Sequence, residues 1–127
     1  MAELKGQATV LLVRDVERTL TYYRDRLGFD VKQFEENPSH YGYANRGDCW
    51  LHFAHWDGVQ PSPNSLLVPP DMFDAYLYVD DVRGLYDELR ERGAELLHGP
   101  EERPWASLEI RVRDPDGHVL AFGQLEP

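Results

Sequence analysis

An internal repeat constrains the fold of this chain more than any other feature of its sequence. Val-Arg-Asp-Val at residues 13–16 corresponds to Val-Asp-Asp-Val at residues 79–82, and Arg-Asp-Arg-Leu-Gly at residues 24–28 corresponds to Arg-Glu-Arg-Gly at residues 90–93. A repeat of this length indicates two copies of one supersecondary unit. The chain has 127 residues, which suits one compact domain and is too short for two domains of ordinary size. We therefore expect both copies to lie within a single domain over residues 1–127.

Each copy begins with a strand followed by a capped helix. A β-rich apolar run precedes an aspartate that favours helix N-caps, and a glycine stands where a left-handed C-terminal residue is expected. The runs are residues 9–13 and 75–79, the aspartates are Asp15 and Asp81, and the glycines are Gly28 and Gly93. Apolar residues recur between these caps at helical spacing. They are Val16, Leu20, Tyr23 and Leu27 in the first helix, and Val82, Leu85 and Leu89 in the second.

Further short strands follow each helix. The predicted strands are residues 29–34, 41–45 and 49–54 in the first copy, and residues 108–112 and 119–123 in the second. Between the copies, residues 57–71 contain four prolines, which predicts a stiff linker rather than a helix or a strand. The sequence thus divides into module one at about residues 7–56, a linker at about 57–71, and module two at about 72–124.

The predicted fold class is α+β, with two tandem βαβββ modules forming a cupped mixed sheet and the helices outside. In each module the helix covers one face of its sheet and leaves the other face open. Two such sheets can close into a shared cup. Periodicity alone also allows an ordinary ferredoxin-like α+β sandwich.

Two segments carry a family resemblance that periodicity does not supply. LLVRDVERTLTYYRDRLGFDV resembles the opening of vicinal oxygen chelate proteins, the glyoxalase/bleomycin resistance protein/dioxygenase superfamily, and YLYVDDVRGLYDELRERGAELL followed by RVRDPDGHVLAFG resembles their second half. The resemblance covers residues 7–124. GPEERPW at residues 99–105 is most similar to the bleomycin-resistance branch. Members commonly pair, so the resemblance implies a homodimer whose cups form within one chain or across two.

The resemblance also locates the positions at which metal-using members carry their ligands. These positions correspond here to Ala8, His52, Asp74 and Ala121. A divalent cation needs about three or more protein donors, and alanine has none in its side chain. His52 and Asp74 remain weak metal candidates, or form a His-Asp pair if they meet. We therefore expect no cofactor and no catalytic metal.

Strand alternation predicts which side chains line the cup. Tyr76 and Tyr78 share a face with Asp74, while Trp50 shares one with His52. In the strand at residues 108–112, the apolar residues should pack on the helix and turn Glu109, Arg111 and Arg113 toward the cup or its rim, where they select a charged ligand or pair with one another and with solvent. Trp105 belongs to the bleomycin-resistance-like segment. The predicted ligand-binding residues are Trp50, His52, Asp74, Tyr76, Tyr78, Trp105, Glu109 and Arg111.

Composition excludes several classes of partner. The formal net charge is -10, with 23 acidic and 13 basic residues, which disfavours contact with nucleic acid and attracts cationic small molecules. Cys49 is the only cysteine, so neither an internal disulfide nor a zinc-binding cysteine cluster is possible. With no secretory leader and no apolar run of membrane-spanning length, we expect a cytoplasmic protein that does not contact a membrane.

These observations favour a metal-independent small-molecule binding protein of the glyoxalase/bleomycin-resistance type. An aromatic cup with few polar groups suits a planar or cationic ligand, and the resemblance implies sequestration as in antibiotic resistance. The alternative is a metal-dependent, glyoxalase-like lyase, isomerase or dioxygenase of the same superfamily. A third hypothesis is a metal-free enzyme using Tyr76, Tyr78 or His52 as acid or base, but the sequence offers no nucleophile-base-orienter set for it.

Overall fold

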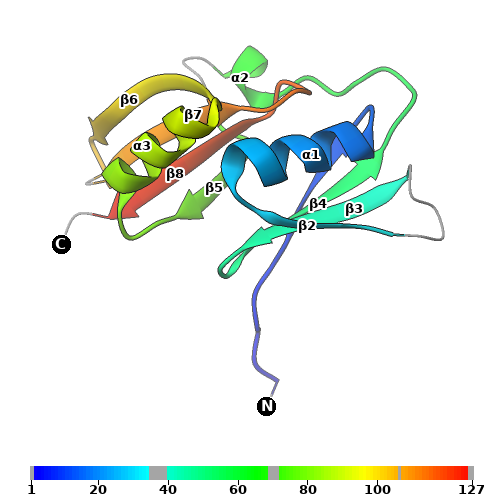
Figure 1. Cartoon of the computed structure of the whole chain (residues 1–127), viewed down its shortest axis with the longest axis horizontal. Helices are drawn as coiled ribbons and strands as arrows, with labels where there is room; N and C mark the ends of the chain where they lie inside the picture. Colours follow the sequence, from blue (N-terminus) through cyan, green and yellow to red (C-terminus); the bar gives the residue numbers. More distant parts are fainter. Residues whose placement is uncertain (1, 35–39, 69–71, 106, 126–127) are drawn as a thin grey trace. The chain divides into compact units, whose positions relative to one another are not determined.

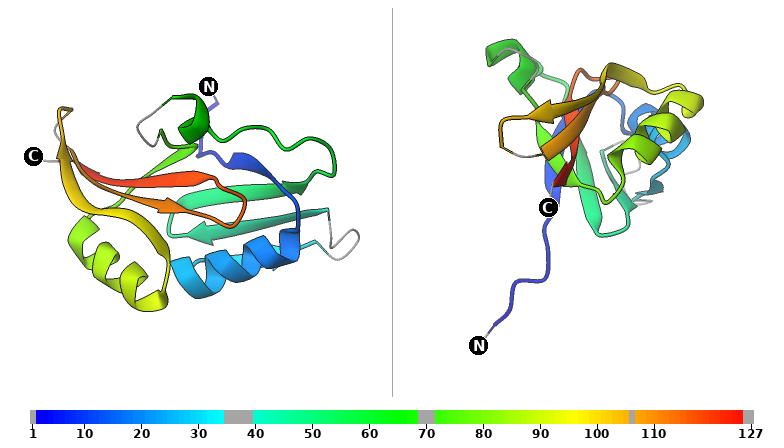
Figure 2. Two further views of the ribbon diagram at one scale, coloured as in Figure 1. Left: turned by 90° about the horizontal axis from the view of Figure 1, so that it is seen from above. Right: turned by 90° about the vertical axis from the view of Figure 1, so that its left-hand side faces the viewer.

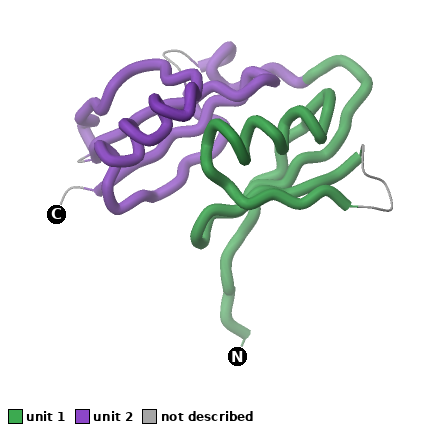
Figure 3. Tube along the Cα trace, viewed as in Figure 1, with its two compact units in different colours: residues 1–60 green, residues 61–127 purple. Residues whose placement is uncertain are grey.

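The computed structural model of the chain describes residues 2–34, 40–68, 72–105 and 107–125. It divides the chain into two compact units, residues 1–60 and residues 61–127 (Figure 3). Each unit carries one four-stranded mixed sheet with a long helix on one face (Figure 1). The predicted α+β class and the two βαβββ modules are therefore confirmed.

Unit 1 contains β1 (Thr9–Val13), α1 (Val16–Leu27), β2 (Asp30–Gln33), β3 (Tyr41–Arg46) and β4 (Cys49–His55). The strand order is β1-β4-β3-β2, with β1 parallel to β4 and the other pairs antiparallel. Helix α1 packs on the sheet through a core of aliphatic and aromatic side chains, which are Leu11, Val13, Val16, Leu20, Tyr23, Leu27, Phe29, Leu51 and Phe53.

Unit 2 repeats this topology with β5 (Ala75–Tyr78), α3 (Val82–Arg92), β6 (Glu95–Arg103), β7 (Ser107–Arg113) and β8 (Val119–Leu125). The strand order is β5-β8-β7-β6, and β5 is parallel to β8. Figure 2 shows α1 and α3 each lying on one face of the sheet of its own unit. The core under α3 consists of Ala75, Leu77, Val82, Leu85, Leu89, Leu108, Ile110, Val112, Leu120 and Phe122.

Both long helices begin and end at the predicted caps. The Asp15 carboxylate accepts a hydrogen bond from the backbone N–H of Arg18, at 3.0 Å, and Asp81 accepts one from Gly84 at the same distance. Gly28 and Gly93 close the helices in the left-handed conformation, with φ of 76° and 83°. Local sequence thus sets the length of each helix.

The predicted linker at residues 57–71 is wrong in one respect, because it contains the short helix α2 (Asn64–Leu67). Pro63 precedes this helix, where its fixed φ and missing N–H are tolerated. The backbone N–H of Asn64 donates to the Asp74 carboxylate at 2.9 Å, and the Asn64 side chain donates to the Phe73 carbonyl at 3.1 Å. The contact with Asp74, ten positions along the chain, therefore stabilises α2, and local spacing does not indicate it. Residues 69–71 of the predicted linker lie outside the described residues.

Among the described helices, none combines the length and the apolar character required to span a lipid bilayer.

Candidate functional site

In unit 1, strand β4 presents aromatic residues on the sheet face that α1 does not cover. Leu51 and Phe53 are buried against the helix, so the alternating residues Trp50 and His52 point to the opposite, open face. Trp50 is 41% exposed even though it is a large apolar side chain. The predicted orientation of Trp50 and His52 therefore agrees with the alternating burial along this strand.

Strand β3 adds two tyrosines to this face, Tyr41 and Tyr43, which were not among the predicted site residues. The Tyr41 hydroxyl lies 2.7 Å from Nδ1 of His52. The Tyr43 ring lies 5.5 Å from the Trp50 ring and 5.9 Å from the His52 ring, measured between centroids. Phe34 extends the cluster, with its ring centroid 5.5 Å from Tyr41 and 5.7 Å from Tyr43. The alternation of Tyr41, Gly42 and Tyr43 is the sequence signal that places both tyrosines on one face.

An open hollow of about 640 Å³ lies beside Trp50 and His52. The remaining lining residues are Lys5, Gly6, Gln7, Ala8 and Asp48. Its wall therefore combines one large aromatic ring with an imidazole, an ammonium and a carboxylate. This combination fits a flat molecule that carries polar substituents.

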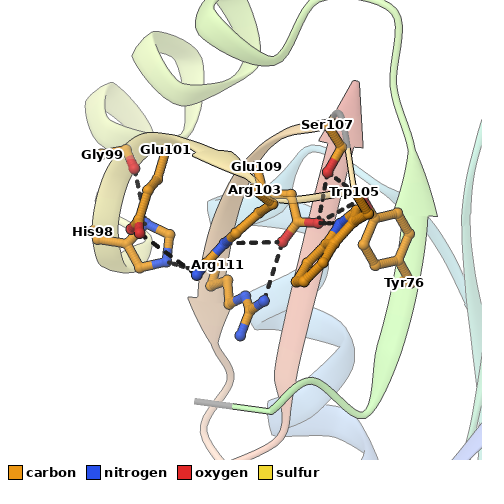
Figure 4. A network of polar contacts seen from close by, with 9 residues as sticks. All are labelled: Tyr76, His98, Gly99, Glu101, Arg103, Trp105, Ser107, Glu109 and Arg111. Carbon is orange, nitrogen blue, oxygen red and sulfur yellow. Dashed lines mark hydrogen bonds and ion pairs between the residues drawn. The ribbon is translucent and has the colours of Figure 1, made fainter. Parts of the chain in front are cut away.

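In unit 2, the sheet face away from α3 is organised around Glu109, which is completely buried. Its Oε2 accepts hydrogen bonds from the Tyr76 hydroxyl at 2.8 Å, the Trp105 indole N–H at 2.8 Å and the Ser107 hydroxyl at 2.9 Å (Figure 4). Its Oε1 accepts from Nη2 of Arg111 at 3.1 Å. Both carboxylate oxygens therefore have partners within the unit.

A second layer of polar contacts extends from Oε1 toward the edge strand β6. Nε of Arg103 lies 3.6 Å from this oxygen, and Nη1 of Arg103 lies 3.5 Å from the Glu101 carboxylate. Nη2 of Arg103 lies 3.3 Å from Nε2 of His98. The two guanidinium groups of Arg103 and Arg111 thus both approach Glu109 from the same side of the carboxylate (Figure 4).

The structure revises the expected setting of the charged residues on β7. Glu109 and Arg111 were expected at the cup or its rim, where exposed pairing contributes little, but they are 0% and 4% exposed. Burial acts to raise the pKa of the Glu109 carboxyl. Hydrogen bonds from Tyr76, Trp105, Arg111 and Ser107 outweigh burial, so this pKa falls below its ordinary value. Glu109 is therefore an ionised, fully bonded acceptor that fixes the side chains around it.

Tyr76 is constrained by the same contact. Burial raises the pKa of its phenol above the ordinary value; the Ser107 hydrogen bond acts against this shift and the Glu109 carboxylate adds to it. Its ring lies 5.1 Å from Phe73 and 5.2 Å from Tyr78. Tyr78 is 68% exposed and Trp105 is 55% exposed. Glu109 thus anchors Tyr76 and Trp105 through their polar atoms, while Trp105 and Tyr78 keep much of their surface accessible.

The Asp74 carboxylate accepts hydrogen bonds from two backbone N–H groups of unit 2. Its Oδ1 accepts from the backbone N–H of Asn64 and its Oδ2 accepts from the backbone N–H of Val119, each at 2.9 Å. Nδ1 of His118 lies 3.9 Å from the same Oδ2. The carboxylate therefore joins α2 to the start of β8.

The residues at the family's ligand positions do not fit a divalent cation. Ala8 and Ala121 supply no side-chain donor, Asp74 accepts two backbone hydrogen bonds, and Nδ1 of His52 contacts Tyr41. Within residues 2–34, 40–68, 72–105 and 107–125, no three His, Cys, Asp or Glu side chains gather closely enough to hold a metal ion.

Comparison with known proteins identifies relatives over nearly the whole chain. The family model described as Glyoxalase/Bleomycin resistance protein/Dioxygenase superfamily matches residues 7–122. Virulence protein STM3117 of Salmonella typhimurium is 26% identical over 119 residues, which span 91% of this chain and 80% of that protein.

Two solved structures from Streptomyces have similar folds. TnmS3 from Streptomyces sp. CB03234, described as an antibiotic binding protein, is 26% identical with a TM-score of 0.72, and 99% of each chain is covered. The bleomycin-binding protein of Streptomyces verticillus, solved with copper(II)-bleomycin, is 22% identical with a TM-score of 0.72. That comparison covers 100% of this chain and 99% of the other, and at this identity it shows the fold alone.

Proposed function

The chain belongs to the glyoxalase/bleomycin resistance protein/dioxygenase superfamily, and we propose that it binds a planar, aromatic or cationic small molecule without a metal ion. The observation that carries this proposal is the exposure of large aromatic side chains on or beside the sheet faces that α1 and α3 do not cover, at Trp50, Tyr78 and Trp105. Exposed aromatic rings that are held in place by neighbouring groups are typical of ligand-binding surfaces.

The polar atoms around these rings support binding through the ring faces. The Trp105 indole N–H and the Tyr76 hydroxyl both donate to Glu109, so neither donor needs an acceptor on a ligand. A ring stacked on such a side chain gains apolar contact without stripping water from an unpaired donor. The held geometry also lowers the entropy lost when a ligand binds.

Charge favours a cationic ligand. The whole chain carries a net charge of -10, and residues 61–127 contain 14 acidic and six basic residues. A field of this sign concentrates cations near the surface and is weakened by salt. The carboxylate of Asp48, which lines the hollow beside Trp50, supplies a local negative group in unit 1.

Metal independence rests on the donor set described above. A Lewis acid that polarises a carbonyl or activates oxygen must be held by several side chains. Here two of the four candidate positions are alanines, Asp74 already accepts two backbone hydrogen bonds, and His52 alone is too few ligands for a metal site. The antibiotic-binding description of TnmS3 also supports binding without turnover as the role of this chain. Sequestration of a toxic compound is the physiological role that we infer.

The test is a titration of EDTA-treated protein with proflavine, a planar cationic dye, and with acridone, its neutral counterpart, followed by dye fluorescence anisotropy and by melting temperature. We expect proflavine to bind more tightly than acridone, to weaken as salt is added, and to raise the melting temperature as a ligand of the native state does. Binding that appears only after addition of a divalent ion would instead favour the metal-dependent enzyme.

Two tryptophan variants and a matched control locate the binding face. Trp50→Ala and Trp105→Ala are expected to weaken proflavine binding by roughly fivefold or more, the loss of one aromatic stacking contact. Trp56 is also exposed, but it follows β4 and its indole N–H donates to the carbonyl of Val59. Trp56→Ala should therefore leave the affinity unchanged. An equal loss in all three variants would contradict the assignment of the open faces.

We also propose that the protein forms a homodimer, as its resemblance to the family implies. Sedimentation equilibrium over a range of protein concentrations tests this assembly. A mass that stays at that of one chain at every concentration would contradict it.

A further inference from the structure

We infer that Tyr41 holds His52 in one tautomer and thereby makes the hollow beside Trp50 selective for a ligand with a hydrogen-bond-accepting oxygen, such as the carbonyl of an aryl ketone. This inference deepens the proposed function, because it assumes that a ligand enters this hollow. It starts from the 2.7 Å contact between the Tyr41 hydroxyl and Nδ1 of His52.

The direction of this hydrogen bond follows from the partners of each group. Within the described residues, His52 is the one hydrogen-bond partner of the Tyr41 hydroxyl. A neutral imidazole carries a proton on one nitrogen and a lone pair on the other, whereas a phenol has one proton to donate. If Tyr41 donates to Nδ1, the phenol proton has an acceptor and the Nδ1 lone pair has a donor. The proton of the imidazole then resides on Nε2. The Nε2–H tautomer is therefore the one that this geometry stabilises.

The opposite edge of the imidazole is available to a ligand. His52 lines the hollow together with Trp50, whereas Tyr41 does not. Within the part of the chain that the structure describes, Nε2 of His52 has no hydrogen-bond partner, and it is not a buried unsatisfied atom. An N–H donor thus lies two residues along β4 from an exposed indole, on the same open face.

This pair of groups defines the chemistry of the subsite. The indole of Trp50 offers a surface for a flat ring, and the Nε2–H offers a donor at its side. A ligand that places a carbonyl oxygen toward His52 satisfies this donor, whereas a ligand that places only an N–H group there leaves both N–H donors without an acceptor. Tyr41 acts here as a positioning residue, since it reaches the ligand only through His52.

The first measurement needs no ligand and reports the tautomer directly. Long-range proton–nitrogen NMR spectra of the whole protein at about pH 8.5 distinguish Nε2–H from Nδ1–H imidazoles. Comparison with His52→Gln identifies the His52 signals. We expect the Nε2–H pattern in the unmodified protein and a mixture of tautomers in Tyr41→Phe, with no change in Tyr43→Phe. An Nδ1–H pattern, or an unchanged pattern in Tyr41→Phe, would overturn the inference.

The second measurement is an NMR titration with 1-indanone, a small aryl ketone. His52→Phe keeps a ring but removes the donor, and we expect affinity to fall roughly two- to tenfold, as for loss of one neutral hydrogen bond. His52→Gln retains an amide N–H near the Nε2 position and should stay within about twofold of the unmodified protein. Equal affinities for all forms would overturn the acceptor subsite. So would the absence of any response to 1-indanone, while the proflavine titration would still decide the broader proposed function.

Discussion

The ring of Tyr76, on β5, lies directly over Gly123, on the neighbouring strand β8. Gly123 pairs with Glu109 across the β7–β8 ladder, so the Tyr76 side chain crosses β8 at this glycine to reach the Glu109 carboxylate. A Cβ atom at residue 123 would collide with the Tyr76 hydroxyl and with its ring carbon Cζ. The absence of a side chain at this one position is therefore what allows the contact between strands that are not neighbours.

Gly123→Ala should destabilise the protein by displacing Tyr76 from Glu109. Loss of a hydrogen bond to a charged group costs about 1.5–3 kcal/mol. Urea unfolding measures the change in the free energy of unfolding. Gly99→Ala is the matched control, because a Cβ atom there would meet Tyr86 at 3.8 Å, an ordinary contact. If the hydroxyl contact is the cause, Gly123→Ala should cost much less in a Tyr76→Ala background.

Glu109→Gln should be among the more damaging single changes in unit 2. It removes the charge that faces the buried Arg111 and replaces one acceptor oxygen by an amide group. Leaving one member of a buried ion pair without its partner costs about 3–5 kcal/mol. The control is Glu101→Gln, because Glu101 is 52% exposed and its pairing with Arg103 should contribute only about 0–1 kcal/mol. Equal stability of the two variants would show that the Glu109 network is energetically unimportant.

A fall in pH should lower the free energy of unfolding through protonation of Glu109. The pKa of Glu109 is lower in the folded chain than its ordinary value. At a pH between these two pKa values, the unfolded chain therefore binds more protons at Glu109 than the folded chain does. Its contribution to stability is therefore complete above the ordinary glutamate pKa of about 4.3 and is lost as the pH falls through the lower folded value. Melting temperatures between about pH 6 and pH 3 should fall more steeply for the unmodified protein than for Glu109→Gln. Parallel curves would contradict this assignment.

A rise in pH should destabilise the protein through Tyr76, as a fall in pH does through Glu109. The pKa of its phenol is raised in the folded chain, mainly by burial. The folded state therefore retains this proton above the ordinary tyrosine pKa of about 10, and the associated stability is lost as the pH rises through the folded value. Ultraviolet difference titration of the unmodified protein should contain a late-titrating tyrosine that is missing in Tyr76→Phe. An unchanged titration curve in the variant would contradict this prediction.

Asp74→Ala should loosen the junction between α2 and β8. The substitution leaves the backbone N–H groups of Asn64 and Val119 without their acceptor, at a cost of about 1–3 kcal/mol. Asp74→Asn retains one acceptor oxygen and should lose about half as much. Hydrogen exchange at these two amides measures the effect locally. The control is Asp87→Ala, which affects a largely exposed carboxylate 3.8 Å from Arg90 and should change little.

Several features of the fold and of the candidate site could be predicted from sequence because their causes are local. The helix caps at Asp15, Gly28, Asp81 and Gly93 act within one turn of the residues they stabilise. The open-face positions of Trp50 and His52 follow from the two-residue period of a strand. Strand β6 (Glu95–Arg103) was not among the predicted strands, and register shifts on either side of His98 interrupt the alternation that would have indicated it.

Other features depend on residues that only the tertiary structure brings together. Tyr76 and Glu109 are 33 positions apart, and Asp74 and Val119 are 45 positions apart. Strand alternation places Ser107 and Arg111 on the same face as Glu109, but no local pattern indicates that Tyr76 reaches this carboxylate or that Asp74 joins two segments. The sequence by itself determined the helix caps and the alternation of faces, since these depend on neighbouring residues, and its repeated motifs carried the two-module organisation and the resemblance to the family. The tertiary structure decided which polar groups are engaged and which remain available to a ligand, since that depends on partners distant along the chain.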